Sequence, residues 1–319
     1  MLCERATDRP PHLGDLAAEL RYCDAAGLGE AVRGARALML WDFFSTAVRD
    51  VWDQAGTLEW IHVAAAGVDT LLFDELRDSD VVVTNAHGVF DRPIAEYVLG
   101  AVIDHAKDSR TSLDLQRRHQ WQHRETRSIL GATALVVGTG AIGREIARLL
   151  RAAGLEVRGV GRVARADDPD FGEVVASSEL AAHAGWADHL VLAAPLTPAT
   201  QGLVGAEVLA AMKPDAQLVN VARGRLVDEA ALLDALLDGR IGGATLDVFG
   251  VEPLPVEHPF WAAPRLTITA HMSGDAIGWQ DALARQFADN ARRWLGGEPL
   301  LNVVDKLLGY IPAVDGGTR

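Results

Sequence analysis

Short apolar runs alternate with segments of helical periodicity along most of this chain. Several runs, such as ALVVG and HLVLAA, are apolar almost without interruption, which is typical of strands covered on both faces. Alternation of such strands with helices predicts an α/β fold, in which crossover helices connect the strands of a parallel sheet. The predicted strands cover residues 37–41, 60–65, 81–85, 133–138, 155–160, 189–194, 217–222, 243–248 and 266–270.

The length of 319 residues predicts about two domains. One helix, predicted from Pro93 to about Arg118, opens with a proline that suits a first helical turn, and we expect it to connect the domains. A later helix, predicted over residues 277–295, is followed by too few residues for another domain. We therefore predict a discontinuous first domain of residues 1–98 and 290–319, and a second domain of residues 99–289.

The composition disfavours several classes of function. With 44 acidic and 30 basic residues the formal net charge is −14, so a nucleic-acid partner is not expected. No apolar run approaches the roughly 20 residues that span a bilayer, and the first residues lack the apolar stretch of a secretory signal. The two cysteines, Cys3 and Cys23, form neither a metal-binding spacing nor a disulfide framework. We expect a cytoplasmic protein with no membrane partner.

A glycine-rich segment, GTGAIG, lies between a predicted strand and a helical run. Gly138 would allow the tight turn, Gly140 would let the backbone approach a pyrophosphate, and Gly143 would let the helix pack closely on the strand. The amino end of that helix would then face the pyrophosphate. A glycine-rich turn without a ligand is the alternative. The sequence predicts a dinucleotide site that also includes Ala141 and Ile142.

The end of the following strand bears on the choice of cofactor. Sites for NAD usually carry an acidic residue about 20 residues after the glycines, whereas this chain has Arg162 there and Arg165 nearby. A guanidinium can bind the 2′-phosphate of NADP through paired hydrogen bonds. Alternatively, both arginines are solvated loop charges. The sequence favours NADP, with NAD as a possible cofactor.

Several longer motifs resemble those of the D-isomer specific 2-hydroxyacid dehydrogenases, and most closely the NADP-dependent glyoxylate/hydroxypyruvate reductases. In chain order they are ILGATALVVGTGAIGREIA, ADHLVLAAPLTPATQGLVG, MKPDAQLVNVARGRLVDEAAL, ATLDVFGVEPLP and ITAHMSG. The resemblance covers nearly the whole chain. It implies two Rossmann-like parallel-sheet domains, namely a doubly wound nucleotide-binding domain and a smaller flavodoxin-like substrate domain. It also implies an NAD(P)-dependent oxidoreductase that acts on 2-hydroxy acids as a homodimer.

The resemblance implies three catalytic residues: Arg223 as the substrate-binding arginine, Glu252 as the acid and His271 as the proton donor. All three follow predicted strands at their carboxyl ends, where open α/β sheets bind ligands. A guanidinium can hold the carboxylate of a 2-oxo acid and polarise its carbonyl. A protonated imidazole can neutralise the alkoxide left by hydride delivery, and a neighbouring carboxylate stabilises that imidazole and fixes its tautomer. The family often has proline before the histidine, where this chain has Ala270.

Further contacts are implied by the same resemblance. Asp247 matches the residue that faces the nicotinamide ring, and Val221 is a further cofactor-binding candidate. The turn at Ala66 and Gly67 is expected to offer backbone N–H groups to the substrate carboxylate. Trp41 matches a tryptophan near the substrate in glyoxylate and hydroxypyruvate reductases, although packing in the core would explain it equally well.

The expected substrate is a small 2-oxo or 2-hydroxy acid, with glyoxylate and hydroxypyruvate as leading candidates. A short D-3-phosphoglycerate dehydrogenase is an alternative. A second alternative is a non-enzymatic dinucleotide-sensing scaffold similar to the C-terminal-binding co-repressors. His119 and His123 lack a third ligand, so no metal is expected. The arginines between residues 110 and 127 are expected to form a solvated or subunit-contact surface.

Overall fold

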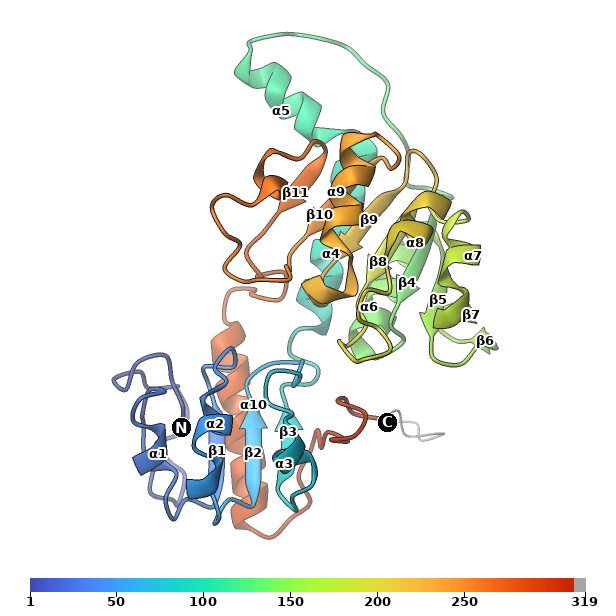
Figure 1. The fold of residues 1–319 in the computed structure, drawn as a ribbon. Helices are drawn as coiled ribbons and strands as arrows, with labels where there is room; N and C mark the ends of the chain where they lie inside the picture. Colours follow the sequence, from blue (N-terminus) through green and yellow to red (C-terminus); the bar gives the residue numbers. More distant parts are fainter. Residues whose placement is uncertain (313–319) are drawn as a thin grey trace. The chain divides into compact units, whose positions relative to one another are not determined.

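The computed structural model describes residues 1–312, which form two units. Unit 1 comprises Met1–Phe90 and the chain from Ala276 onward, and unit 2 comprises Asp91–Asp275 (Figure 1). The predicted division, at residues 98 and 289, differs from this one at both points. Helix α4 (Asp91–Lys107) packs against α6 (Ala141–Ala152) of unit 2. Helix α10 (Trp279–Leu295) belongs to unit 1, where its Phe287 ring stacks on Trp60 with the centroids 5.4 Å apart.

Unit 1 is built on a parallel sheet of three strands in the order β1-β2-β3, with β1 at Ala37–Leu40, β2 at Trp60–Val63 and β3 at Val82–Asn85. Leu2 forms single-residue parallel bridges to both Leu40 and Cys23, which adds two short segments beside β1. Counted along the chain, the five segments then lie in the flavodoxin-like order 2-1-3-4-5. The connections contain the short helices α1 (Leu28–Ala31), α2 (Ala47–Asp50), η1 (Trp52–Gln54) and α3 (Asp74–Arg77).

Unit 2 contains an eight-stranded sheet in the order β11-β10-β9-β8-β4-β5-β7-β6. Every neighbouring pair is parallel except β6 and β7. Without β6, the order is the doubly wound 3-2-1-4-5-6 arrangement with one further parallel strand, and it reverses between β4 and β8. The strands are β4 (Thr133–Val137), β5 (Glu156–Gly161), β6 (Arg165–Asp168), β7 (Gly172–Ala176), β8 (His189–Leu192), β9 (Gln217–Asn220), β10 (Gly243–Leu246) and β11 (Leu266–Ile268).

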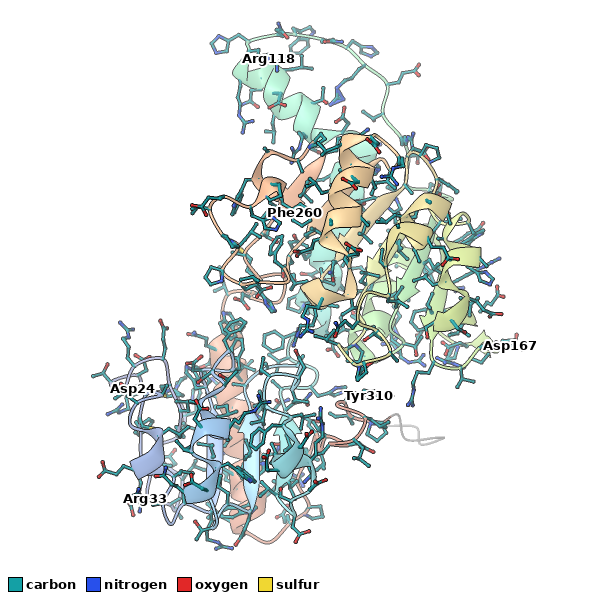
Figure 2. All side chains as sticks on the ribbon, in the orientation of Figure 1. Asp24, Arg33, Arg118, Asp167, Phe260 and Tyr310 are labelled. Atoms are coloured by element: carbon teal, nitrogen blue, oxygen red, sulfur yellow. The ribbon has the colours of Figure 1, made fainter. Side chains whose placement is uncertain are left out.

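The helices of unit 2 pack in two groups, α4 against α6, and α8 against α7 and α9. Buried apolar side chains pack α7, α8 and α9 against the sheet, and this core includes Phe249 and Phe260, of which Phe260 is labelled in Figure 2. The remaining elements are α7 (Leu180–Ala184), α8 (Ala206–Ala211), α9 (Glu229–Leu237), η2 (Ser177–Glu179), η3 (Gly224–Leu226) and η4 (Pro259–Ala262). Among the described residues, no helix is both long enough and apolar enough to cross a membrane.

The prediction of one continuous helix over residues 93–118 is wrong. The structure divides it into α4 and α5 (Ser109–Arg117) at Asp108, whose φ of 47° is left-handed. The Asp108 side chain accepts a hydrogen bond from Thr111 N and so caps the second helix. Aspartate tolerates the left-handed region better than most residues because its short side chain bonds locally. The break therefore depends on one capping residue inside an otherwise helical pattern.

Candidate active site

The glycine-rich loop lies between β4 and α6, beside the point where the strand order reverses. Gly138 has a φ of 108°, and a Cβ on it would lie 2.6 Å from the carbonyl carbon of Ala193, just beyond β8. A Cβ on Gly143 would lie 1.9 Å from the Gly138 carbonyl oxygen. Packing therefore requires glycine at both positions.

Gly140, the N-cap of α6, is different because a Cβ there would meet no atom within 4 Å. The space beside its backbone is open, while the half-buried Ala141 and Ile142 form the first turn of α6 behind it. An open approach to the amino end of a helix fits a pyrophosphate, which would meet unsatisfied N–H groups and the positive end of the helix dipole. These residues are thus arranged to hold a dinucleotide.

The end of β5 lies directly against the glycine loop. A Cβ on Gly161 would lie 3.3 Å from Oγ1 of Thr139, which stands between the first two glycines of the loop. Arg162 follows Gly161 and is exposed. The structure therefore places Gly161 against the loop with Arg162 next in the chain, and binding of the cofactor by Arg162 stays a prediction.

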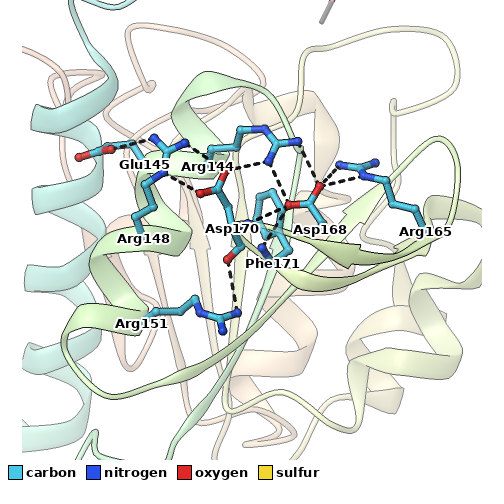
Figure 3. A network of polar contacts seen from close by, with 8 residues as sticks. All are labelled: Arg144, Glu145, Arg148, Arg151, Arg165, Asp168, Asp170 and Phe171. Carbon is cyan, nitrogen blue, oxygen red and sulfur yellow. Dashed lines mark hydrogen bonds and ion pairs between the residues drawn. The ribbon is translucent and has the colours of Figure 1, made fainter. Parts of the chain in front are cut away.

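Arg165 takes part in the network of ion pairs shown in Figure 3. Its Nε and Nη2 donate to Oδ2 of the buried Asp168, at 2.9 and 2.8 Å. Arg144, on α6, donates to both oxygens of Asp168 at 3.0 and 3.1 Å. Burial raises the pKa of Asp168, but the hydrogen bonds from Arg144 and Arg165 outweigh it and hold that pKa well below its usual range. One edge of the Arg165 guanidinium is therefore already engaged by Asp168, and binding of a 2′-phosphate by Arg165 stays a prediction.

Glu252 and His271 form a direct pair, with Nδ1 of His271 2.7 Å from Oε2 of Glu252. The other carboxylate oxygen accepts a hydrogen bond from Phe249 N at 2.8 Å. Burial raises the pKa of Glu252, but the hydrogen bonds from His271 and Phe249, and the nearby charge of Arg223, lower it overall. An ionised Glu252 accepts a hydrogen bond from Nδ1–H, so Nε2 is the ring nitrogen left to transfer a proton.

Arg223 lies in the turn that follows β9. The buried Asn220 shapes this turn: its Nδ2 donates to the Arg223 carbonyl at 2.9 Å, and its Oδ1 accepts from Ala222 N at 3.0 Å. A Cβ on Gly224 would lie 1.9 Å from the carbonyl carbon of Phe249. The turn that carries Arg223 therefore packs directly on the segment that leads to Glu252. The glycine after the arginine was the available sequence signal for this contact, and our prediction did not use it.

Asp247 is fully buried and holds the turn that carries His271. Its backbone carbonyl accepts from His271 N at 2.8 Å, and its two carboxylate oxygens accept from Met272 N and Ser273 N at 2.9 and 2.8 Å. His271 itself has a φ of 51°, which is uncommon for a residue other than glycine. The described hydrogen bonds of the Asp247 carboxylate are thus with this turn and with Thr269 just before it. Its contact with a nicotinamide ring stays a prediction, as does that of Val221, which is buried at the end of β9.

The substrate-binding candidates of unit 1 lie after β1 and β2. Trp41 is half-buried and therefore does not belong to the buried core. The carbonyl of Ala66 accepts a hydrogen bond from Nδ2 of the buried Asn85 at 2.6 Å, which orients the turn that includes Gly67. Sequence reasoning missed Asn85 because its partner, Ala66, lies in the turn after a neighbouring strand. Residues 1–312 contain no cluster of histidine, cysteine and acidic side chains that would hold a metal ion.

Comparison with known proteins identifies the family. The model of the family described as "D-isomer specific 2-hydroxyacid dehydrogenase, NAD binding domain" matches residues 99–273. The chain belongs to this family. A 2-hydroxyacid dehydrogenase of this family is an NAD(P)-dependent oxidoreductase, and both the α/β fold and the nicotinamide dinucleotide cofactor expected from the sequence are confirmed.

Relatives of this dehydrogenase carry different names. It is 33% identical to (S)-sulfolactate dehydrogenase of Chromohalobacter salexigens, over 86% of this chain and 89% of the relative. It is 32% identical to glyoxylate/hydroxypyruvate reductase A of Serratia proteamaculans, over 80% and 82% of the two chains. A match to D-3-phosphoglycerate dehydrogenase of Methanocaldococcus jannaschii, at 31% identity, covers 81% of this chain but only 49% of that longer protein.

A solved structure is also similar to this dehydrogenase. It is the D-isomer specific 2-hydroxyacid dehydrogenase of Xanthobacter autotrophicus in complex with NADPH and MES. The TM-score is 0.75 and the identity 36%, over 88% of this chain and 86% of the other.

Proposed function

We propose that this dehydrogenase reduces a small 2-oxo acid with NADPH, and that His271 donates the proton. The observation that carries this proposal is the hydrogen bond between His271 and Glu252, which stands at the carboxyl edge of the same sheet as Arg223 and the glycine loop. Glyoxylate and hydroxypyruvate are the leading substrates.

Each residue has a separate task in this reaction. A nicotinamide dinucleotide bound at the glycine loop supplies the hydride. Arg223 binds the carboxylate of the 2-oxo acid and polarises its carbonyl. Nε2 of His271 donates a proton to the carbonyl oxygen as negative charge develops there. Glu252 holds Nδ1 and stabilises the imidazolium before the transfer. Trp41, Ala66 and Gly67 stay our candidates for substrate binding by unit 1.

The preference for NADPH rests on Arg162, with Arg165 in support. Arg162 follows the end of β5 against the glycine loop, and no acidic residue occupies that position. The acids that come later, Asp168 and Asp170, are engaged by Arg144 and Arg148. The neighbour from Xanthobacter autotrophicus binds NADPH. We therefore expect NADPH to be the better cofactor.

A panel of 2-oxo acids tests the proposal, with the loss of NADPH absorbance as the readout. We expect the highest kcat/KM with glyoxylate or hydroxypyruvate. A clear preference for 3-phosphohydroxypyruvate would instead support the alternative of a short D-3-phosphoglycerate dehydrogenase, and a preference for 3-sulfopyruvate a sulfolactate dehydrogenase. Tight NADPH binding without turnover of any 2-oxo acid would support a dinucleotide-sensing scaffold.

We also propose that α5 and the following coil form a subunit contact in a homodimer. No residue of α5 is buried, Trp121 is fully exposed and Leu113 is about half exposed. Arg118, at the far end of α5, lies well away from the sheet of unit 2 (Figure 2). An exposed tryptophan on such an extension is best explained by a second copy that covers it. Light scattering should show a dimer that Trp121→Ser weakens, and a monomeric wild type would contradict this.

The two cysteines, Cys3 and Cys23, are buried and not joined in a disulfide. This fits the expected cytoplasmic location, where thiols remain reduced.

A further inference from the structure

A chain of hydrogen bonds in unit 2 leads from helix α4 to the buried carboxylate of Asp247. The Tyr97 hydroxyl lies 2.6 Å from Oγ1 of Thr269, and that oxygen lies 2.5 Å from Oδ1 of Asp247. Tyr97 belongs to α4, whereas Thr269 directly follows β11. Tyr97 and Thr269 are 172 residues apart, so no single sequence motif contains the chain of contacts.

The direction of these hydrogen bonds follows from the chemistry of the groups. Asp247 accepts an N–H on each carboxylate oxygen, which is the arrangement of an ionised carboxylate. The single hydroxyl hydrogen of Thr269 therefore points to Asp247, and the Thr269 oxygen accepts the hydrogen of Tyr97. Burial raises the pKa of Tyr97 to about 12, so the phenol keeps its hydrogen at any pH used for an assay.

Asp247 in turn holds the backbone N–H groups of His271 and of the two residues that follow it. Its backbone carbonyl holds His271 N, and its carboxylate holds the N–H groups of Met272 and Ser273. The left-handed φ of His271 persists only where surrounding contacts enforce it. The direction of the imidazole thus depends on this turn as well as on Glu252, and Thr269 is the side chain that donates a hydrogen bond to the Asp247 carboxylate.

We propose that Thr269 and Tyr97 are positioning residues for His271, which act through Asp247 to fix the turn that presents the imidazole. Their role rests on the proposed role of His271 as proton donor. The elements joined by these hydrogen bonds lie next, along the chain, to the two points where the polypeptide passes from one unit to the other. Helix α4 begins at the first crossing, after Phe90, and the turn ends just before the second, after Asp275.

Loss of the Thr269 hydroxyl should affect the chemical step much more than the affinity for the cofactor, most of whose predicted contacts lie elsewhere. Without that donor the Asp247 carboxylate can rotate, and the turn carrying His271 can shift with it. A misplacement of about 1 Å can cost up to a hundredfold in rate. The glycine loop and Arg162 lie on other loops and do not contact Thr269 in the described residues.

The test compares Thr269→Val, which removes only the hydroxyl, with Thr269→Ser, which keeps it. We expect Thr269→Val to lower kcat about tenfold or more, with the Kd for NADPH within about twofold of the wild type by tryptophan fluorescence. Thr269→Ser should recover most of the lost rate. Thr267→Val is the matched control, because Thr267 is exposed on β11 two residues earlier. It should leave both kcat and Kd unchanged.

A double-mutant cycle separates positioning from a general structural effect. In a His271→Asn background, Thr269→Val should cause no further loss, because its effect passes through the missing imidazole. Tyr97→Phe is a second variant that removes one hydroxyl and should lower kcat by a smaller factor, again only when His271 is present. It keeps the inference testable if Thr269→Val does not fold.

Three results would overturn the inference. The first is a kcat for Thr269→Val or Tyr97→Phe equal to that of Thr267→Val. The second is a loss of kcat from Thr269→Val that is just as large in the His271→Asn background. The third is a Kd for NADPH that rises in step with the loss of rate. If His271→Asn itself retains full turnover, the proposed function fails as well. If His271→Asn loses turnover while the Thr269 and Tyr97 variants keep it, the inference alone fails.

Discussion

The glycine loop and the His271 turn stand at the same edge of one sheet but are held in place in different ways. The loop is fixed by the absence of side chains, since a Cβ at Gly138 or Gly143 would overlap backbone atoms. The turn is fixed by side chains, because the buried Asp247 accepts hydrogen bonds along residues 269–273. We propose that the first region binds the cofactor and that the second transfers the proton. Substitutions in the two regions should therefore have separable effects.

The largest effect is expected from His271→Asn. Asparagine removes the proton donor, and general acid catalysis contributes about 10²–10⁴-fold. We expect kcat with the best 2-oxo acid to fall by a factor in that range in steady-state assays. A loss of less than about fivefold, well below that contribution, would mean that another group donates the proton.

On the cofactor side, Arg162→Asp should change selectivity more than activity. A charged hydrogen bond to the 2′-phosphate is worth about 1.5–3 kcal/mol, and an aspartate adds repulsion. The ratio of kcat/KM for NADPH to that for NADH should therefore fall at least about tenfold. Arg148→Asp is the control, since Arg148 lies on α6 and pairs with Asp170. A ratio that stays the same in Arg162→Asp would show Arg162 to be a solvated loop charge.

The glycine loop offers a sharper comparison within one region. Gly140→Ala places a methyl group in open space, so the free energy of unfolding should hardly change while the Kd for NADPH rises several-fold. Gly143→Ala forces a methyl group against the Gly138 carbonyl and should destabilise the fold by about 1–3 kcal/mol or more. Thermal unfolding and NADPH titration of both variants test this. Equal loss of stability in the two would contradict the assigned roles.

A smaller effect is expected from Glu252→Gln, which keeps the shape of the side chain but removes its charge. Reduction requires a protonated His271, and Glu252 is its direct anionic partner, with Asp247 and Asp275 nearby and Arg223 opposing them. Without the Glu252 charge the imidazole loses its anionic partner, so kcat/KM for reduction should fall several-fold. Because the pKa of Glu252 is lowered, the wild-type carboxylate is charged across the assay range, and the loss should appear throughout that range.

The matched control is Glu229→Gln. Glu229 accepts a hydrogen bond at 2.7 Å from the N–H of Gly250, which lies in the loop that carries Glu252, and Glu229 makes no described contact with His271. Its kcat/KM should match that of the wild type. An unchanged kcat/KM in Glu252→Gln would contradict the role of Glu252.

The contrast between the glycine loop and the His271 turn also explains which parts of the structure could be predicted from the sequence. The glycine loop is local, and its spacing alone predicted a strand, a turn and a helix that the structure contains. The nine predicted strands are all present, with ends that differ by one or two residues. The β6–β7 hairpin was missed because its segment, RADDPDFGEVVA, is charged and half exposed, and its stability comes from the pairing of Arg144 with Asp168 and Asp170.

The partners of the His271 turn could not be predicted because they are distant in sequence. Motif comparison pointed to His271, Glu252 and Arg223, and the structure brings His271 and Glu252 into direct contact. Nothing in the sequence near Thr269 or Tyr97 indicates that they meet, since a threonine after a strand and a tyrosine in a helix are ordinary. The pairing arises only when α4 packs beside the end of β11.

The separation of cofactor binding from proton transfer is tested most directly by an NADPH titration of His271→Asn, followed by tryptophan fluorescence. Because the glycine loop and Arg162 remain intact in this variant, we predict a Kd within about twofold of the wild type, a difference of only ~0.4 kcal/mol. A Kd that rises in proportion to the loss of turnover would show that His271 serves cofactor binding, and would contradict the assignment of binding and chemistry to two separate regions.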